Sequence, residues 1–144
     1  YRITDSPPDG RGAYQSMRLA LEDASLQATD IGYVNAHGTS TPMNDPSETQ
    51  GILRTFGTHR VPVSSTKSMT GHLVAACGAV EAIISVLAIT EGILPPTINL
   101  DTPDPRCDLN HVANRAQSAQ IDHAMTNAFG FGGSNGSLIV SRWR

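Results

Sequence analysis

The feature that most constrains this chain is a short apolar segment that runs directly into a histidine, a glycine and a row of hydroxyl residues. Residues 31–34 have the β-branched and aromatic character of a strand, and His37, Gly38 and the hydroxyl residues 39–41 follow. A strand would hold His37 at its carboxyl end, and Gly38 would let the chain turn away sharply. Such strand ends are where open α/β sheets place their chemistry. The sequence therefore predicts a functional site around His37.

The same order of strand, polar loop and helix recurs along the chain. Apolar spacing and Gly/Pro punctuation predict helices over 11–25, 45–56 and 71–91, and strands over 31–34, 61–65, 124–128 and 137–141. Asp45 is expected to cap the second helix, with Pro46 in its first turn and Glu48 at the capping-box position. We expect residues 94–100 to be extended and residues 101–123 to be irregular. This pattern is typical of an α/β fold.

The third predicted helix, 71–91, is apolar nearly all round and is expected to be sandwiched within the protein. Its stretch 73–89 comes nearest to a membrane span, with Glu81 as the single charge. It is short for a span and lacks basic flanks, so a buried core helix is the favoured interpretation. Glu81 would then need a partner, either Lys67 in a structural salt bridge or a bound monovalent cation.

Composition excludes several classes of function. The 144 residues suit one domain, 1–144, and the net charge of −3 arises from 10 basic and 13 acidic residues without clusters of either sign. This balance speaks against nucleic-acid or membrane partners. Cys77 and Cys107 form no CxxC motif, which favours a reducing, cytoplasmic location. Cys77 lies among alanines on the apolar helix and is interpreted as inert packing.

Three predicted loops carry groups capable of chemistry. One holds His37, the next holds Lys67 and His72, and the third holds Phe131 among glycines. If the three strands are neighbours in one sheet, these loops converge at one end of it. Two histidines can then donate ring N–H bonds to one oxygen and stabilise an enolate or oxyanion. The alternative is structural: His37 caps a turn, His72 opens a helix and Lys67 is solvated.

The glycine-rich stretch 130–136 is not a dinucleotide-binding fingerprint, because a strand rather than a helix follows it. Its glycines suit unusual backbone angles and movement of Phe131. The alternative is a simple hairpin with two core phenylalanines, Phe129 and Phe131. A metal-dependent hydrolase built on His37, His72 and Asp45 is a more distant possibility.

Four ordered motifs together resemble the C-terminal half of the β-ketoacyl-[acyl-carrier-protein] synthases, and most closely the type II elongating enzymes. The motifs are VNAHGTSTP at 34–42, SSTKSMTGHL at 64–73, PPTINL at 95–100 and NAFGFGGSNGS at 127–137. The resemblance covers essentially the whole chain. It implies the C-terminal half of a thiolase-like α-β-α-β-α sandwich, in which a mixed sheet is flanked by helices and one apolar helix is buried.

The resemblance also implies roles for individual residues. His37 and His72 would be the two histidines of a Cys-His-His triad that acts in decarboxylative Claisen condensation, and Lys67 would belong to the same network, held with Glu81. Further positions match the pantetheine-binding hydroxyls (Thr39 and Thr41), the gating loop (Phe129, Gly130, Phe131, Gly132 and Gly133) and a monovalent cation site of some members (Asn35, Glu81 and Asn127). No other cofactor is implied, since the phosphopantetheine arm arrives with the carrier-protein substrate.

The resemblance leaves out the nucleophilic cysteine, which belongs to the family's N-terminal half. Neither Cys77 nor Cys107 lies in a matching motif. The implied partners are therefore that N-terminal half, an acyl carrier protein and a second copy in a homodimer, and we expect the isolated chain to be inactive and to expose apolar surface. The alternatives are a non-catalytic subunit of the chain-length-factor type and a fragment of a polyketide ketosynthase.

Overall fold

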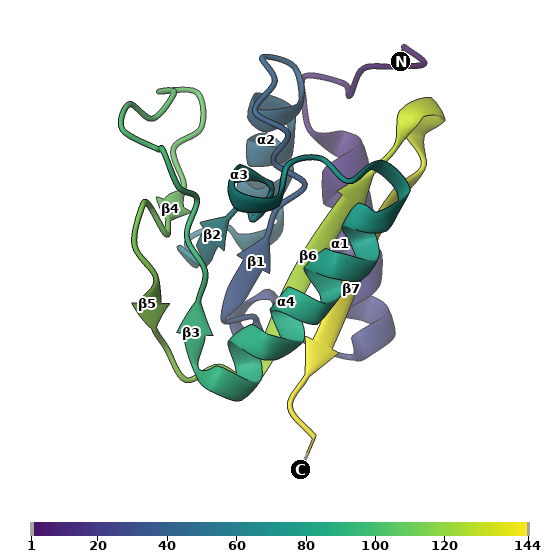
Figure 1. Cartoon of the computed structure of the whole chain (residues 1–144). Helices are drawn as coiled ribbons and strands as arrows, with labels where there is room; N and C mark the ends of the chain where they lie inside the picture. Colours follow the sequence, from purple (N-terminus) through teal and green to yellow (C-terminus); the bar gives the residue numbers. More distant parts are fainter. Residues whose placement is uncertain (1, 144) are drawn as a thin grey trace.

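A five-stranded mixed sheet is the central layer of the structure, a computed structural model that describes residues 2–143 (Figure 1). The strand order is β4-β2-β1-β6-β7, and only β7 runs antiparallel to its neighbour. The bounds are β1 Tyr33–Asn35, β2 Pro62–Ser64, β4 Asn110–His111, β6 His123–Phe129 and β7 Asn135–Ser141. A separate two-stranded sheet pairs β3, Ile93–Leu94, with β5, Gln117–Ser118.

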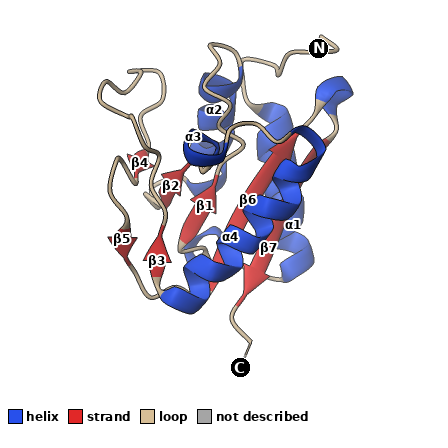
Figure 2. Ribbon diagram, viewed as in Figure 1, coloured by secondary structure: helices blue, strands red, loops and turns tan. Residues whose placement is uncertain are grey.

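Helices cover both faces of this sheet (Figure 2). The helices α1, Arg11–Ala24, and α2, Asn44–Phe56, pack against each other on one face, and α4, Cys77–Glu91, lies on the other face over β6 and β7. The short helix α3, Lys67–Thr70, follows β2, and single 3₁₀ turns occupy Ala28–Asp30, Val74–Ala76 and Phe131–Gly133. The predicted α/β class, a mixed sheet flanked by helices, is confirmed.

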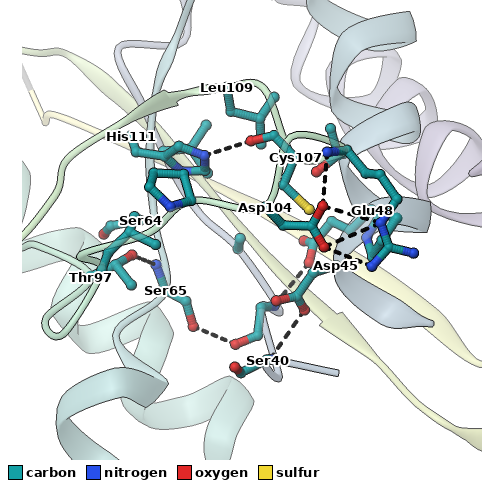
Figure 3. Close-up of a pocket in the computed structure, with 18 of the residues that line it drawn as sticks. Ser40, Asp45, Glu48, Ser64, Ser65, Thr97, Asp104, Cys107, Leu109 and His111 are labelled. Atoms are coloured by element: carbon teal, nitrogen blue, oxygen red, sulfur yellow. Dashed lines mark hydrogen bonds and ion pairs between the residues drawn. The ribbon is translucent and has the colours of Figure 1, made fainter. Parts of the chain in front are cut away.

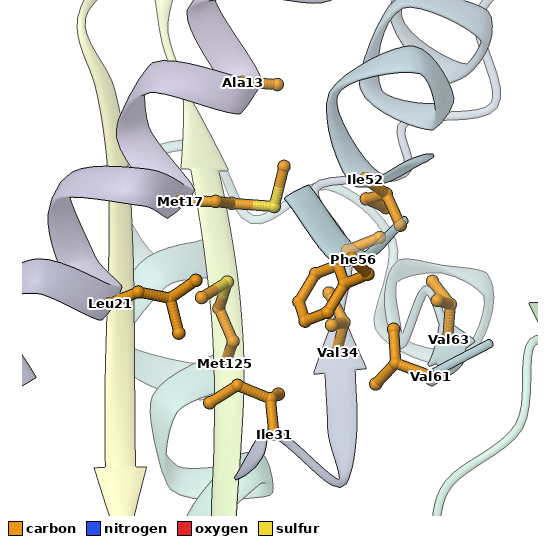
Figure 4. Packing of buried hydrophobic residues seen from close by; sticks show 11 residues of the cluster. Ala13, Met17, Leu21, Ile31, Val34, Ile52, Phe56, Val61, Val63 and Met125 are labelled. Atoms are coloured by element: carbon orange, nitrogen blue, oxygen red, sulfur yellow. The ribbon is translucent and has the colours of Figure 1, made fainter. Parts of the chain in front are cut away.

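The main core lies between the sheet and the α1–α2 pair (Figure 4). Spacing of four residues aligns Ala13, Met17 and Leu21 on one side of α1, where they meet Phe56 of α2 and Met125 of β6. The two helices approach closely at Gly51, where an added Cβ atom would stand 2.6 Å from the Cβ of Ala13. The periodicity found in the sequence therefore builds the layer that supports β1 and the segment after it.

The prediction that the third helix is sandwiched within the protein is wrong for this chain. One side of α4, including Glu81, Ser85 and Ala88, is buried on the sheet, while Ile83 and Leu87 are at least half exposed. The helical stretch Val74–Glu91 is long and apolar enough to cross a membrane by length and composition alone. Its buried side instead packs a carboxylate against the sheet, and its apolar outer side has no cover within residues 2–143.

Several predicted boundaries also differ. The residues before Cys77 form a loop and a 3₁₀ turn rather than the first turns of a helix over 71–91, and a turn of helix, α3, occupies the predicted polar loop. Asp45 is not the cap of α2, which begins at Asn44, because the Oδ1 atom of Asp45 accepts the Ser40 N–H at 3.1 Å. Glu48 makes no capping box, because its carboxylate bonds to the segment after β1.

Candidate active site

The loops after β1, β2 and β6 meet at one end of the sheet because these strands are parallel neighbours. Val34 is in register with Val63 of β2 and with Met125 of β6. The imidazole rings of His37 and His72 lie with their centroids 5.7 Å apart and nearly perpendicular to each other. The ring of Phe129 lies 5.5 Å from that of His37. The structure thus brings together residues from three loops that are distant in the sequence.

Glu48 fixes the backbone that carries His37. Its carboxylate accepts the backbone N–H groups of His37 at 2.8 Å and Gly38 at 2.9 Å, and the side-chain N–H of Asn127 at 3.0 Å. Gly38 makes this turn possible, since its φ is +40° and an added Cβ would lie 2.5 Å from the Cβ of Ser65. Burial is the main reason why the pKa of Glu48 is raised, and these hydrogen bonds act against it.

The sequence held a signal for Glu48 that the capping interpretation missed. Glu48, Ile52 and Phe56 follow one another at spacings of four, so the carboxylate lies on the same side of α2 as the two core residues. A carboxylate on the buried side of a helix needs several donors. Those donors come partly from Asn127, 79 residues away, and local patterns do not report such contacts.

Replacing Glu48 by alanine should lower the free energy of unfolding by about 2–4 kcal/mol, because several buried donors lose their acceptor. Urea denaturation of the two proteins measures this difference. Glu48→Gln should fall between them, since one acceptor oxygen remains. Glu91→Gln, at the exposed end of α4, is the matched control and should change stability by less than about 0.5 kcal/mol. Equal effects at positions 48 and 91 would contradict the anchoring function of Glu48.

His37 is neutral at physiological pH. Burial, and then the positive charge of Lys67 and that of His72 when it is protonated, lower the pKa of His37 from its ordinary 6.5 to about 4. The Nδ1 atom of His37 is buried without a hydrogen-bond partner among the described residues. A neutral imidazole still carries one ring N–H and can donate it to a substrate oxygen.

The lowered pKa of His37 predicts a pH dependence of stability. Between pH 6.5 and about 4 the unfolded state binds a proton that the folded state does not, so the contribution of His37 is lost as the pH falls through this window. His37→Gln should show a shallower loss over the same window. Urea denaturation at several pH values from 7 to 4 measures the difference, and parallel curves for the two proteins would contradict the pKa assignment.

Lys67 and Glu81 form a buried ion pair beside the histidines. The distance from Lys67 Nζ to Glu81 Oε1 is 2.5 Å, and both side chains are at most 4 % exposed. Burial raises the pKa of Glu81, although the bond to Lys67 and the charges of Lys67 and His72 favour the ionised form. Lys67 is therefore not solvated, which was the structural alternative for this residue.

The three residues suggested for a cation each use a side-chain oxygen in a hydrogen bond within the protein. The side-chain oxygen of Asn35 accepts hydrogen bonds from Thr66, that of Asn127 accepts one from Ser137, and Glu81 uses Oε1 for Lys67. Among the side chains of these three residues, Oε2 of Glu81 is the one polar atom that is buried without a hydrogen-bond partner in the described part of the chain. Hard cations take several oxygen ligands, so a cation here would need further oxygens besides these side chains. Within residues 2–143, no three His, Cys, Asp or Glu residues gather as a metal site.

The hydroxyl and glycine-rich segments flank the histidines. The Thr39 and Thr41 hydroxyls are hydrogen-bonded to each other at 3.1 Å. The segment from Phe129 to Gly133 includes two glycines with positive φ, Gly132 at +74° and Gly133 at +80°, and Phe131 is 74 % exposed. An added Cβ at either glycine would meet nothing within 4 Å, so this loop has room to rearrange.

A cavity of about 330 Å³ lies between α2 and the segment 97–111 (Figure 3). Its lining includes Ser40, Thr41 and Cys107, but neither His37 nor His72. Burial raises the pKa of the Cys107 thiol. The cavity also borders Ala36 and Gly38, so it adjoins the loop that carries His37 without including either imidazole.

Comparisons with known proteins identify the family of this chain. Residues 1–101 match the family model "Beta-ketoacyl synthase, C-terminal domain". The chain is 51 % identical to 3-oxoacyl-[acyl-carrier-protein] synthase 2 of Coxiella burnetii (strain RSA 493 / Nine Mile phase I), over 99 % of this chain and 35 % of that protein. The chain spans about a third of the length of the curated relatives that it matches.

Solved ketosynthases share the fold. The ishigamide ketosynthase/chain length factor superimposes with a TM-score of 0.95 at 37 % identity, covering 99 % of this chain and 35 % of that one. A type II PKS acyl-carrier protein in complex with its ketosynthase gives a TM-score of 0.93 at 38 % identity, over 100 % of this chain and 36 % of that one. The chain therefore belongs to the β-ketoacyl synthase family and corresponds to its C-terminal domain, with the thiolase-like fold that the motifs implied.

Proposed function

We propose that this chain is the C-terminal part of a 3-oxoacyl-[acyl-carrier-protein] synthase that elongates fatty acids. The complete enzyme joins an acyl group held on a cysteine to malonyl carrier protein. This chain supplies the two histidines and Lys67, and the cysteine lies in the N-terminal half. The pair of imidazoles 5.7 Å apart, of which His37 is neutral, is the single observation that carries the proposal.

The histidines act on the malonyl thioester. Breaking its bond to the carboxylate releases CO₂ and leaves the electron pair as an enolate, whose oxygen accepts N–H bonds from His37 and His72. The enolate carbon then forms a bond to the acyl carbonyl carbon and the cysteine sulfur leaves, which gives the 3-oxoacyl thioester. Neutral imidazoles suit this work, since each donates an N–H without supplying a proton that would quench the enolate.

The surrounding residues support these steps. Burial, and then the positive charge of Lys67, which is paired with Glu81, lower the pKa of His37 and keep its ring neutral. The hydroxyls of Thr39 and Thr41 bind the pantetheine arm, and movement of Phe131 at the flexible glycines opens the acyl site.

The proposed partners follow from the same assignment. The exposed apolar side of α4 packs against the N-terminal half, because an uncovered apolar surface of this kind marks an interface. An acyl carrier protein delivers the substrate, as expected from the similarity to a ketosynthase in complex with such a protein. The complete enzyme is proposed to be a soluble, cytoplasmic homodimer that requires no further cofactor.

Combining this chain with its N-terminal half tests the proposal. The combined protein should release CO₂ from malonyl carrier protein and form a 3-oxoacyl product, whereas this chain alone should do neither. Intact mass after incubation with an acyl thioester should show acylation of the N-terminal half and no adduct on Cys77 or Cys107. An acyl adduct on this chain alone would contradict the assignment of the nucleophile.

A second candidate is a non-catalytic subunit of the chain-length-factor type, favoured by the structural similarity to a ketosynthase/chain length factor pair. A subunit that only shapes an acyl pocket does not need paired imidazoles or a buried Lys67, and this chain has both. The test above separates the two candidates, because such a subunit would release no CO₂. Product analysis would separate a polyketide ketosynthase from a fatty-acid enzyme.

A further inference from the structure

The thiol of Cys77 lies directly against His72. Its Sγ atom is 3.2 Å from Nδ1 of the imidazole, and the residue is 5 % exposed. The same sulfur accepts the backbone N–H of Leu73 at 3.0 Å. Cys77, the first residue of α4, is thus bonded to the two residues at the start of the preceding loop, 72–76.

The direction of these hydrogen bonds follows from a third contact. The backbone N–H of Val74 donates to Nδ1 of His72 at 3.1 Å. A ring nitrogen that accepts an N–H carries no proton of its own, so the proton between His72 and Cys77 belongs to the thiol. Cys77 therefore accepts from Leu73 and donates to His72, and the ring proton of the neutral imidazole stays on Nε2.

The backbone at Val74 is strained. Its φ is +53°, a region that a β-branched residue adopts only under constraint. This conformation turns the chain that follows Val74, and Cys77 comes to lie against residues 72 and 73. The thiol of Cys77, after the turn, bonds to Leu73 and His72, before it, and these bonds oppose its relaxation.

We propose that Cys77 is a positioning residue for His72. It holds the strained turn at Val74 closed, so that two donors face Nδ1 and the imidazole presents its Nε2–H to the substrate oxygen. The expected effect of Cys77 on catalysis rests on the proposed function, whereas its effect on the tautomer of His72 does not. This gives Cys77 a task beyond the inert packing that the sequence suggested.

The test compares Cys77→Ala with Cys77→Ser in the complete enzyme, with Cys107→Ser as the matched control. In Cys77→Ala, kcat should fall about threefold to tenfold with little change in KM, the size expected for one lost hydrogen bond that acts in the transition state. Serine keeps one donor and one acceptor at nearly the same place and should recover most of that loss. Cys107→Ser should match the parent enzyme in the tautomer of His72 and in kcat, because neither histidine is among the residues that line the cavity beside Cys107.

A rescue experiment separates positioning from simple packing. Glycine adopts positive φ without strain, so Val74→Gly should restore kcat in the Cys77→Ala background. A defect that came only from an empty space at position 77 would not respond to this change. Failure of both serine and Val74→Gly to recover kcat would overturn the proposal.

The tautomer of the His72 ring can be measured without an activity assay. Nitrogen NMR of histidine-labelled enzyme should show His72 protonated at Nε2 in the parent and as a mixture of both tautomers in Cys77→Ala. An unchanged tautomer in Cys77→Ala would overturn the proposal. A changed tautomer together with an enzyme that tolerates His72→Ala would uphold the positioning of the ring and refute the proposed function of His72.

Discussion

Replacing His72 by alanine should lower the rate of malonyl decarboxylation by the complete enzyme about 100-fold to 1,000-fold, the usual effect of removing one oxyanion donor. His37→Ala should fall in the same range, because the two rings lie 5.7 Å apart and serve one oxygen. The double variant should lose little more than either single variant, since residues that act as a unit are not additive. The release of CO₂ from malonyl carrier protein measures all three.

The control for these variants is His123→Gln. His123 begins β6, at the opposite end of that strand from Phe129, and its ring bonds to Ser141. It should leave the decarboxylation rate within about twofold of the parent, as expected of a residue that makes no contact in the transition state. A loss of less than threefold in both His72→Ala and His37→Ala would remove the basis of the proposed function.

Replacing Lys67 by methionine should lower the free energy of unfolding by about 3–5 kcal/mol, because it leaves the carboxylate of Glu81 buried and unpaired. The deficit relative to the parent should shrink as the pH falls. Burial already raises the pKa of Glu81, and without Lys67 the folded variant takes up a proton more readily than the unfolded chain. Urea denaturation at pH 7 and pH 5 measures both effects.

Two further variants check the cause of this loss. Lys67→Met combined with Glu81→Leu should recover most of the stability, since replacing a whole buried pair by apolar residues is often nearly neutral. Asp108→Asn, which breaks the exposed pair with Arg60 at 3.0 Å, should leave the stability nearly unchanged, because solvent screens this pair. If Lys67→Met behaves like Asp108→Asn, the buried pair is not important for stability.

The sequence predicted the frame of the site well. The strands around Val34, Val63 and Met125 and the polar loops after them all occur, and the three strands are neighbours, which was the condition for their loops to converge. These features follow from local apolar patterns and from the general rule that parallel strands end at one edge of the sheet. The resemblance to ketosynthases then supplied the assignment of His37 and His72.

The interactions within the frame were harder to predict. Glu48 and Asn127 meet across the fold, and the capping interpretation considered only the neighbours of Glu48 in the sequence. The apolar composition of α4 predicted burial on every side, yet composition does not say which surface covers a helix, and the outer side is exposed here. The contact between Cys77 and His72 depends on the unusual backbone of Val74, which no propensity indicates.

The position of β1 in the middle of the sheet has a consequence for synthesis of the chain. Its neighbours are β2, about 30 residues later, and β6, about 90 residues later, so its pairings have a high contact order. A nascent chain on the ribosome must extend past residue 129 before Asn127 can reach Glu48. Until then, a shortened chain contains His37 and His72 but lacks the contacts that hold them together. Substrate binding at the two histidines would therefore show that β2 and β6 have both paired with β1.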